Sequence, residues 1–254
     1  MSAALIIARY TLIEAVRNRL FGIAILGMLA GLGISHFLGR IAVTESAATG
    51  EAVMAGLYRF FAVFSACAFV ISGMLREYHD KGMEYCLAMD MTRTAYFFGK
   101  LIGYSGCAAL LAVLYGLPLL SGGDGFAVLI WGMSLFMELL VMVSVSLFFS
   151  LSLSQMPAAL ASVAGFYLLS RSMGTLLLVM NGPLAVHDAS HDALDAAISW
   201  VGWLLPRLDA YARTAWLLYP GASWRDLSEA AAQSAIYLAL ISTASLHDLG
   251  RKRL

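Results

Sequence analysis

Charged residues are scarce in this sequence. They make up 13% of its 254 residues, whereas hydrophobic residues make up 61%. Soluble domains carry about a quarter charged and about half apolar residues, so a chain this apolar, with a mean hydropathy of +0.80, cannot cover itself with polar groups in water. We therefore expect the lipid bilayer to be its solvent. The 16 basic residues are balanced by 16 acidic ones, so no excess charge is present to attract nucleic acid.

Cysteine is scarce as well, which argues against a disulfide framework and against a cysteine metal site. The 3 cysteines, Cys67, Cys86 and Cys107, are scattered, and no two are spaced as Cys-x-x-Cys. We interpret them as small buried residues. Two catalytic motifs are also missing. The sequence contains no His-Glu-x-x-His, and Gly99-Lys100 lacks both the upstream glycine and the following hydroxyl residue of a phosphate-binding loop.

Apolar stretches, by contrast, are long, and short polar or turn-forming segments separate them. A helix of about 20 apolar residues crosses the hydrocarbon core of a bilayer at about 1.5 Å per residue. Turn signals such as Pro118, 121–125 and Pro157 divide the stretches. We predict an all-α integral membrane protein with a single transmembrane domain over 1–254 and six transmembrane helices, at about 20–38, 55–75, 97–119, 126–150, 157–180 and 230–246.

Residues 2–19 are predicted to form an amphipathic helix at the membrane surface. At about 100° per residue their larger apolar side chains fall in one sector. Arg9 lies within this sector, where its aliphatic stem can follow the apolar surface. The alternative is that the segment simply extends the first span. We expect no N-terminal cleavage, because the apolar block that follows is long and lacks a small-residue cleavage pattern.

The segment 184–229 is richer in polar and aromatic residues and holds four of the 5 tryptophans. Tryptophan and tyrosine favour the membrane–water boundary, so we predict short interfacial helices between the fifth and sixth spans. Within this segment His187 and His191 are one helical turn apart, beside Asp188 and Asp192. This spacing can bind Zn²⁺ or Cu²⁺, but it is also typical of a solvated helix. Without a third clear ligand we predict no metal site.

Lysine and arginine are distributed unevenly between the two sides of this topology. With six spans, both termini and 76–100 share one side, which collects ten basic residues against four on the other. Because cytoplasmic loops are enriched in Lys and Arg, we predict that both termini are cytoplasmic. The ten are Arg9, Arg17, Arg19, Arg76, Lys81, Arg93, Lys100, Arg251, Lys252 and Arg253, and the four are Arg40, Arg207, Arg213 and Arg225.

Two ionisable residues lie near the middle of predicted spans. Glu138 in the fourth span and Arg171 in the fifth lie at similar sequence distances from the turn at 152–156, so their depths should agree to within a few Å. A lone charge at such a depth costs several kcal/mol, so such residues normally pair. We predict an ion pair between adjacent antiparallel helices, which either clamps them together or lines a transport path.

The longest charged island between the first apolar stretches is 76–100. Its pattern predicts a short amphipathic helix whose apolar residues enter a groove of a soluble partner. The alternative is a solvated loop that only follows the bias for cytoplasmic positive charge. Within the island begins a Gly-x-x-x-Gly pattern, Gly99 to Gly103, which is typical of helix contacts but also arises by chance in a chain with 23 glycines. The charged residues that would set the docking register are Glu77, Lys81, Glu84 and Arg93.

The order of residues in this island is familiar. Glu77 is followed by Gly82, a Cys86-Leu87-Ala88 run, Arg93 and then Gly99-Lys100. This order resembles the cytoplasmic loop between the second and third spans of type-2 ABC exporter permeases. Met83 and Asp90 stand where that family usually has Thr and Pro.

Two further segments resemble the same family. The first, 8–21, is similar to the N-terminal elbow helix of these permeases. The second, 205–209, reads Leu-Pro-Arg-Leu-Asp. It resembles an element between the last two spans of six-span permeases associated with multicopper-enzyme maturation.

The resemblance implies a non-catalytic permease subunit of an ATP-driven exporter in the bacterial inner membrane. Its implied partners are a second permease copy, expected to form a homodimer, and two copies of a separate ATPase subunit that binds ATP and Mg. The alternative is an ATPase-independent carrier, or a membrane-embedded enzyme, that uses Glu138 and Arg171 itself. In the exporter scheme 76–100 is a cytoplasmic coupling helix, and its ATPase-coupling residues are Glu77, Lys81, Gly82, Glu84, Arg93, Gly99 and Lys100.

Overall fold

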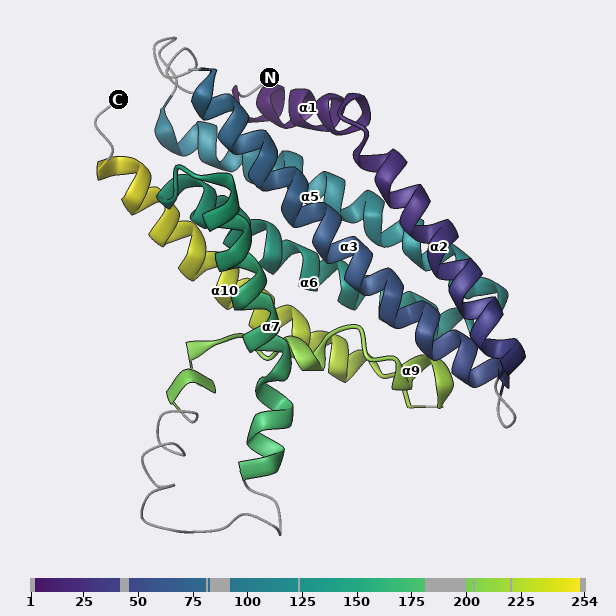
Figure 1. Ribbon diagram of the computed structural model, residues 1–254. Coiled ribbons are helices and arrows are strands. Elements are labelled where there is room, and N and C mark those ends of the chain that lie inside the picture. Colours follow the sequence, from purple (N-terminus) through teal and green to yellow (C-terminus); the bar gives the residue numbers. More distant parts are fainter. Residues whose placement is uncertain are drawn as a thin grey trace.

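The protein is a bundle of long helices (Figure 1). The structure, a computed structural model, describes residues 3–41, 46–80, 82, 92–122, 124–180, 200–202, 204–219 and 221–251, and all regular elements within these ranges are helical. The long helices are α1 (Ala3–Arg17), α2 (Leu20–Ile41), α3 (Ser46–His79), α5 (Arg93–Gly116), α6 (Gly125–Ser152), α7 (Met156–Met180) and α10 (Trp224–Arg251). The short ones are η1 (Leu117–Ser121), η2 (Leu208–Ala210) and α9 (Ala215–Leu218).

Five helices in the described part of the chain, α2, α3, α5, α6 and α7, are long and apolar enough to cross a membrane. The prediction of an all-α, multi-span membrane protein is therefore confirmed. The predicted sixth span, 230–246, lies within α10. This helix is 28 residues long, which corresponds to about 42 Å, but it is not among the five because it is more polar.

Helix α6 forms the centre of the bundle and contacts α3, α5, α7 and α10. Trp131, Leu135 and Leu139 on α6 are fully buried. The most apolar window of α6 is 61% buried, whereas the corresponding windows of α2 and α7 are only 22% buried. Helices α2 and α7 therefore lie at the periphery and expose apolar side chains, such as Leu26 and Leu168, to lipid or to another protein.

Helix α1, which lies within the predicted 2–19, lies across one end of the bundle (Figure 1) and packs against α5. Gly99 and Gly103 permit this contact. A methyl group at Gly103 would lie 2.7 Å from Thr11 Cβ, and one at Gly99 would lie 2.9 Å from Ile7 Cβ. The two helix backbones thus approach each other at a surface that has no room for side chains.

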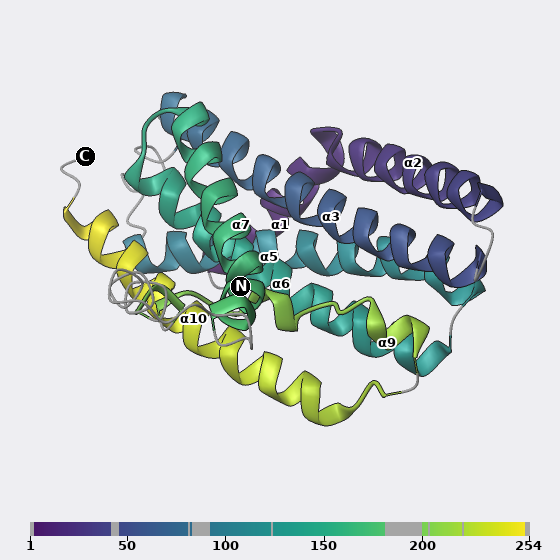
Figure 2. The same ribbon diagram turned by 60° about the horizontal axis from the view of Figure 1, so that its bottom comes forward.

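Both termini lie at the same end of the bundle, beside the C-terminal turn of α3 and the first turn of α5 (Figure 1). We call this the terminal end. Figure 2 shows α9 and the start of α10 at the other end, which we call the loop end. Helix α6 returns to the terminal end, where the Ser152 hydroxyl donates a hydrogen bond of 2.9 Å to Asp248 near the end of α10. Helix α10 thus runs from the loop end to the terminal end.

Candidate functional site

At the terminal end, an ion pair joins α3 to α5. Lys100 Nζ lies 2.5 Å from Glu77 Oε2, and the Lys100 side chain is 8% exposed. The Lys100 ammonium also lies 5.9 Å from the centre of the Tyr104 ring, which is within the range of a cation–π contact. A buried ammonium requires such compensation. Two of the predicted coupling residues therefore have each other as partners.

Arg93, at the first position of α5, joins that helix to the end of α10. Its guanidinium donates hydrogen bonds to the backbone carbonyls of Leu249 and, at 3.1 Å, Gly250. The last carbonyls of a helix lack hydrogen-bond donors within it and carry partial negative charge. The guanidinium of Arg93 supplies both the donors and a positive charge. Thr92 caps α5 by accepting a hydrogen bond from the Ala95 backbone N–H.

The remaining predicted coupling residues fall into two groups. Gly99 lies beneath α1, and at Gly82 a methyl group would lie 3.0 Å from Glu77 Cγ, so both positions favour a small residue. Lys81 and Glu84 lie outside the described residues, as does the rest of 83–91 within the predicted coupling helix. The sequence pattern predicts charged residues that face a partner. Within the chain, Glu77 pairs with Lys100, and Arg93 contacts the end of α10.

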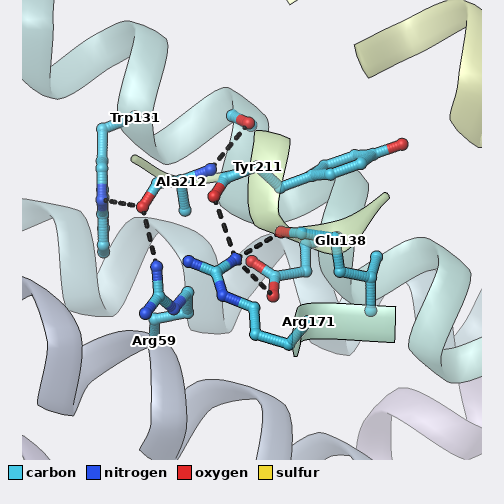
Figure 3. A network of polar contacts seen from close by, with 8 residues as sticks. Arg59, Trp131, Glu138, Arg171, Tyr211 and Ala212 are labelled. Carbon is cyan, nitrogen blue, oxygen red and sulfur yellow. Dashed lines mark hydrogen bonds and ion pairs between the residues drawn. The ribbon is translucent and has the colours of Figure 1, made fainter. Parts of the chain in front are cut away.

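A second charged site lies in the core, where α3, α6 and α7 meet the segment 208–212 (Figure 3). Glu138 on α6 is completely buried. Arg171 on α7 points toward it, with 3.6 Å between Nη1 and Oε1. Among the described residues neither Glu138 oxygen accepts a hydrogen bond. The negative charge of the carboxylate is therefore compensated mainly by Arg171, its ion-pair partner, with a further contribution from the nearby guanidinium of Arg59.

Arg171 also holds the segment 208–212 in place. The same Nη1 donates to the carbonyls of Leu208 and, at 3.2 Å, Tyr211. Gly174, one turn further along α7, allows Asp209 to come close, because a methyl group there would overlap the Asp209 carboxylate. One arginine therefore joins an acidic residue of α6 to the backbone of the connection between α7 and α10.

The backbone of Ala212 forms three hydrogen bonds with side chains of α3 and α6. Its carbonyl accepts hydrogen bonds from Arg59 Nη1 on α3 and Trp131 Nε1 on α6, both at 3.1 Å, and its N–H donates to Ser134 Oγ at 3.0 Å (Figure 3). Its φ of +43° lies in the left-handed region, which a residue with a side chain seldom adopts. Such a conformation persists where its surroundings determine it, as these three side chains do.

Tyr211 attaches the same segment to α10. Its hydroxyl donates to the Ala230 carbonyl at 3.0 Å and lies 2.9 Å from Ser234 Oγ. Burial raises the pKa of Tyr211 to about 12, although the hydrogen bond with Ser234 acts in the opposite direction, so the phenol remains protonated near neutral pH and can donate. The segment 208–212 thus contacts four long helices.

Sequence reasoning identified Glu138 and Arg171, and the structure brings them together. It missed Arg59, Trp131 and Tyr211. The Leu-Pro-Arg-Leu-Asp run at 205–209 indicated a special segment, but nothing in it identified side chains from α3 and α6 as its partners. His187 and His191 lie outside the described residues. Within the described residues no three His, Cys, Asp or Glu side chains are grouped so as to hold a metal ion.

The five apolar helices and the buried ion pair define a multi-pass integral membrane protein. The chain belongs to the ABC-2 transporter family, because the family model described as "ABC-2 family transporter protein" matches residues 40–243. No curated protein matches the chain. The narrower resemblance to permeases of multicopper-enzyme maturation is not supported by this match.

The family defines the role of the chain in outline. It is the membrane permease domain of an ABC-2 type transporter. Such permeases are typically not catalytic and generally pair with ATPase subunits, which hydrolyse the ATP. This agrees with the absence of a phosphate-binding loop in the sequence.

Proposed function

We propose that this chain is the permease subunit of an exporter and converts ATP hydrolysis by separate ATPase subunits into movement of its helices. The observation that carries the proposal is the set of contacts at the terminal end. Glu77 with Lys100 joins α3 to α5, and Arg93 joins α5 to α10. A displacement of residues 80–92 by a bound ATPase would therefore move α3, α5 and α10 together.

In this proposal the terminal end faces the cytoplasm of a bacterium, and the protein lies in the inner membrane. The excess of Lys and Arg on this side supports the orientation. We further propose that α10 is the sixth span. Two observations support this: its length, and contacts that attach its beginning to the connection 208–212 and its end to Arg93. The segment 76–100 would then be the part that contacts the ATPase.

We propose an assembly of two permease copies and two ATPase subunits. The exposed apolar side chains on the peripheral helices α2 and α7, among them Leu26, Phe37, Leu168 and Leu178, support a second permease copy as a neighbour. The ATPases would dock at the terminal end. Mass measurement of the detergent-solubilised complex tests this composition, and a stable complex with a single permease would contradict it.

At the core site we propose that Glu138 and Arg171 act as a clamp on the segment 208–212 and do not themselves bind the transported substrate. The complete burial of Glu138 and the use of Arg171 by backbone carbonyls support the clamp.

The experiment that tests the proposed function is reconstitution. The chain is purified from its native membranes together with the ATPase that co-elutes, and each is placed in liposomes alone and together. We expect ATP hydrolysis only when the ATPase is present, at a rate that the permease changes. If the chain alone hydrolyses ATP, or if no ATPase binds it, the proposal is wrong.

A further inference from the structure

Helix α1 has an unusual outer surface. The side that faces α5 contains small residues and Ile7, whereas the opposite side exposes Leu5, Ile6, Ile13 and Val16, which are between 44% and 68% exposed. Arg9 and Arg17 are exposed as well. Apolar side chains with interspersed basic ones are typical of a helix in the headgroup region of a membrane. This surface therefore fits the lipid interface beside the bundle.

A polar cavity opens at the C-terminal half of this helix. Its volume is about 440 Å³, and α1, the turn after it and the last turns of α3 surround it. Two apolar cavities of similar volume lie between other helices, and no charged side chain lines them. The residues that line the polar cavity are Tyr10, Ile13, Glu14, Arg17, Asn18 and Arg76.

The charges of this cavity favour an anion. Glu14 forms an ion pair with Arg76 and so fixes the position of that guanidinium. Arg17, in the last turn of α1, has no acidic partner among the described residues. Two arginines against one carboxylate leave an excess of one positive charge, and Asn18 adds an amide donor beside them. Paired guanidinium groups are well suited to phosphate oxygens.

We propose that this cavity binds the headgroup of an anionic phospholipid. Arg17, Asn18 and Arg76 would contact the phosphate, while Tyr10 and Ile13 at the rim would contact the glycerol and the first methylene groups. The acyl chains would then follow the exposed apolar side of α1. Basic cavities between helices near the membrane surface are known to hold anionic headgroups. The bound lipid would join α1 to α3 at the point where α1 turns into α2.

The position of the cavity favours a lipid as the source of the phosphate. The first apolar span begins at Leu20, two residues after Asn18, and Arg76 ends the apolar part of α3. The cavity is therefore at the boundary between the hydrocarbon and water, where phospholipid headgroups are concentrated. This inference depends on the protein being embedded in a membrane and not on the direction of transport.

Lipid binding by the purified full chain tests the proposal. The chain is placed in nanodiscs of zwitterionic lipid with increasing amounts of phosphatidylglycerol, and the bound anionic lipid is counted by native mass spectrometry. The double variant Arg17→Gln/Arg76→Gln should bind it about tenfold more weakly, because both arginines line the cavity and each contact with the lipid phosphate contributes up to about fivefold. Arg9→Gln, an exposed arginine of the same helix outside the cavity, should change binding less than about twofold.

A lysine variant and a competition with inorganic phosphate distinguish a specific lipid site from the alternatives. Arg17→Lys/Arg76→Lys keeps the charge but loses the paired guanidinium geometry, so it should bind more weakly than the unmodified chain and more tightly than the glutamine variant. If the glutamine double variant unfolds, Arg17→Gln, which leaves the Glu14–Arg76 ion pair in place, should still bind several-fold more weakly than Arg9→Gln. Equal losses in Arg9→Gln and the cavity variant would mean a diffuse attraction and would overturn the proposal. Displacement of the lipid by millimolar inorganic phosphate would overturn the lipid as the source and indicate a soluble phosphate ligand instead.

Discussion

The guanidinium of Arg171 lies 3.6 Å from the carboxylate of Glu138 and, with the same nitrogen, 3.2 Å from the carbonyl of Tyr211. It therefore compensates a buried charge and holds a backbone segment at the same time. A pair of this kind contributes little net stability when intact, but the loss of one partner leaves an uncompensated buried charge. Stability measurements on single and double variants can therefore show whether the two residues act as a pair.

Replacement of Arg171 alone should be strongly destabilising. We expect Arg171→Met to lower the free energy of unfolding by about 3–5 kcal/mol, because the completely buried Glu138 then loses its ion-pair partner. The double variant Arg171→Met/Glu138→Leu should recover a large part of this loss, though not the hydrogen bonds to Leu208 and Tyr211. Thermal unfolding in detergent measures both. A double variant that is no more stable than Arg171→Met would show that Glu138 is not held by this charge.

Transport measurements on the same double variant separate the two roles of the pair. A clamp tolerates replacement by apolar side chains as long as the complex assembles, so ATP hydrolysis by the complex should remain. Loss of transport in a stable, fully assembled double variant would instead indicate that the pair lines the transport path.

The ion pair between Glu77 and Lys100 predicts a charge-swap result. Lys100→Glu places two carboxylates against each other at a site where the lysine side chain is 8% exposed, and we expect it to cost about 3 kcal/mol. The swap Glu77→Lys/Lys100→Glu restores an ion pair and should restore both thermal stability and the effect of the permease on ATP hydrolysis. If stability returns but this effect does not, the two residues contact the ATPase directly, as the sequence pattern suggested.

Close packing between α1 and α5 predicts opposite effects for two identical substitutions. A methyl group at Gly103 would lie 2.7 Å from Thr11 Cβ and 3.1 Å from Ala8 Cα, so Gly103→Ala should destabilise by about 1–3 kcal/mol. Gly132, inside α6, has no atom within 4 Å of that position, so Gly132→Ala should stabilise by up to about 1 kcal/mol. Thermal unfolding of the two variants in one detergent checks this. Equal shifts would mean that α1 does not pack on α5 in this way.

The sequence predicts the parts of this fold that depend on local pattern. Five of the six spans predicted from apolar runs correspond to helices that are long and apolar enough to cross a membrane. Residue counting from the turn at 152–156 places Glu138 and Arg171 at one depth. The contacts of Ala212 with Arg59 and Trp131 depend on how the connection after α7 folds back over α3 and α6. No periodicity encodes that path, so the sequence could not predict these contacts.

The sequence also does not show whether a charged residue at the terminal end pairs within the chain or with another protein. Glu77, Arg93 and Lys100 read as a docking surface, because charged residues near a predicted loop are equally suited to an external partner and to one another. Their pairing depends on the packing of α3, α5 and α10. The Gly99 to Gly103 spacing did indicate a helix contact, but not that α1 would be the helix involved.

The position of α10 can be tested by labelling. In a variant without the native cysteines Cys67, Cys86 and Cys107, the substitutions Arg225→Cys and Arg251→Cys place single thiols at exposed positions near the two ends of this helix. If α10 is the sixth span, a membrane-impermeant maleimide should label one thiol only from outside the cell and the other only in inverted vesicles. Arg40→Cys, at the end of α2, should be labelled from the same side as Arg225→Cys, because the end of α2 and the start of α10 both lie at the loop end. Labelling of both α10 thiols from the same side would mean that this helix lies along the membrane and that the chain crosses it five times.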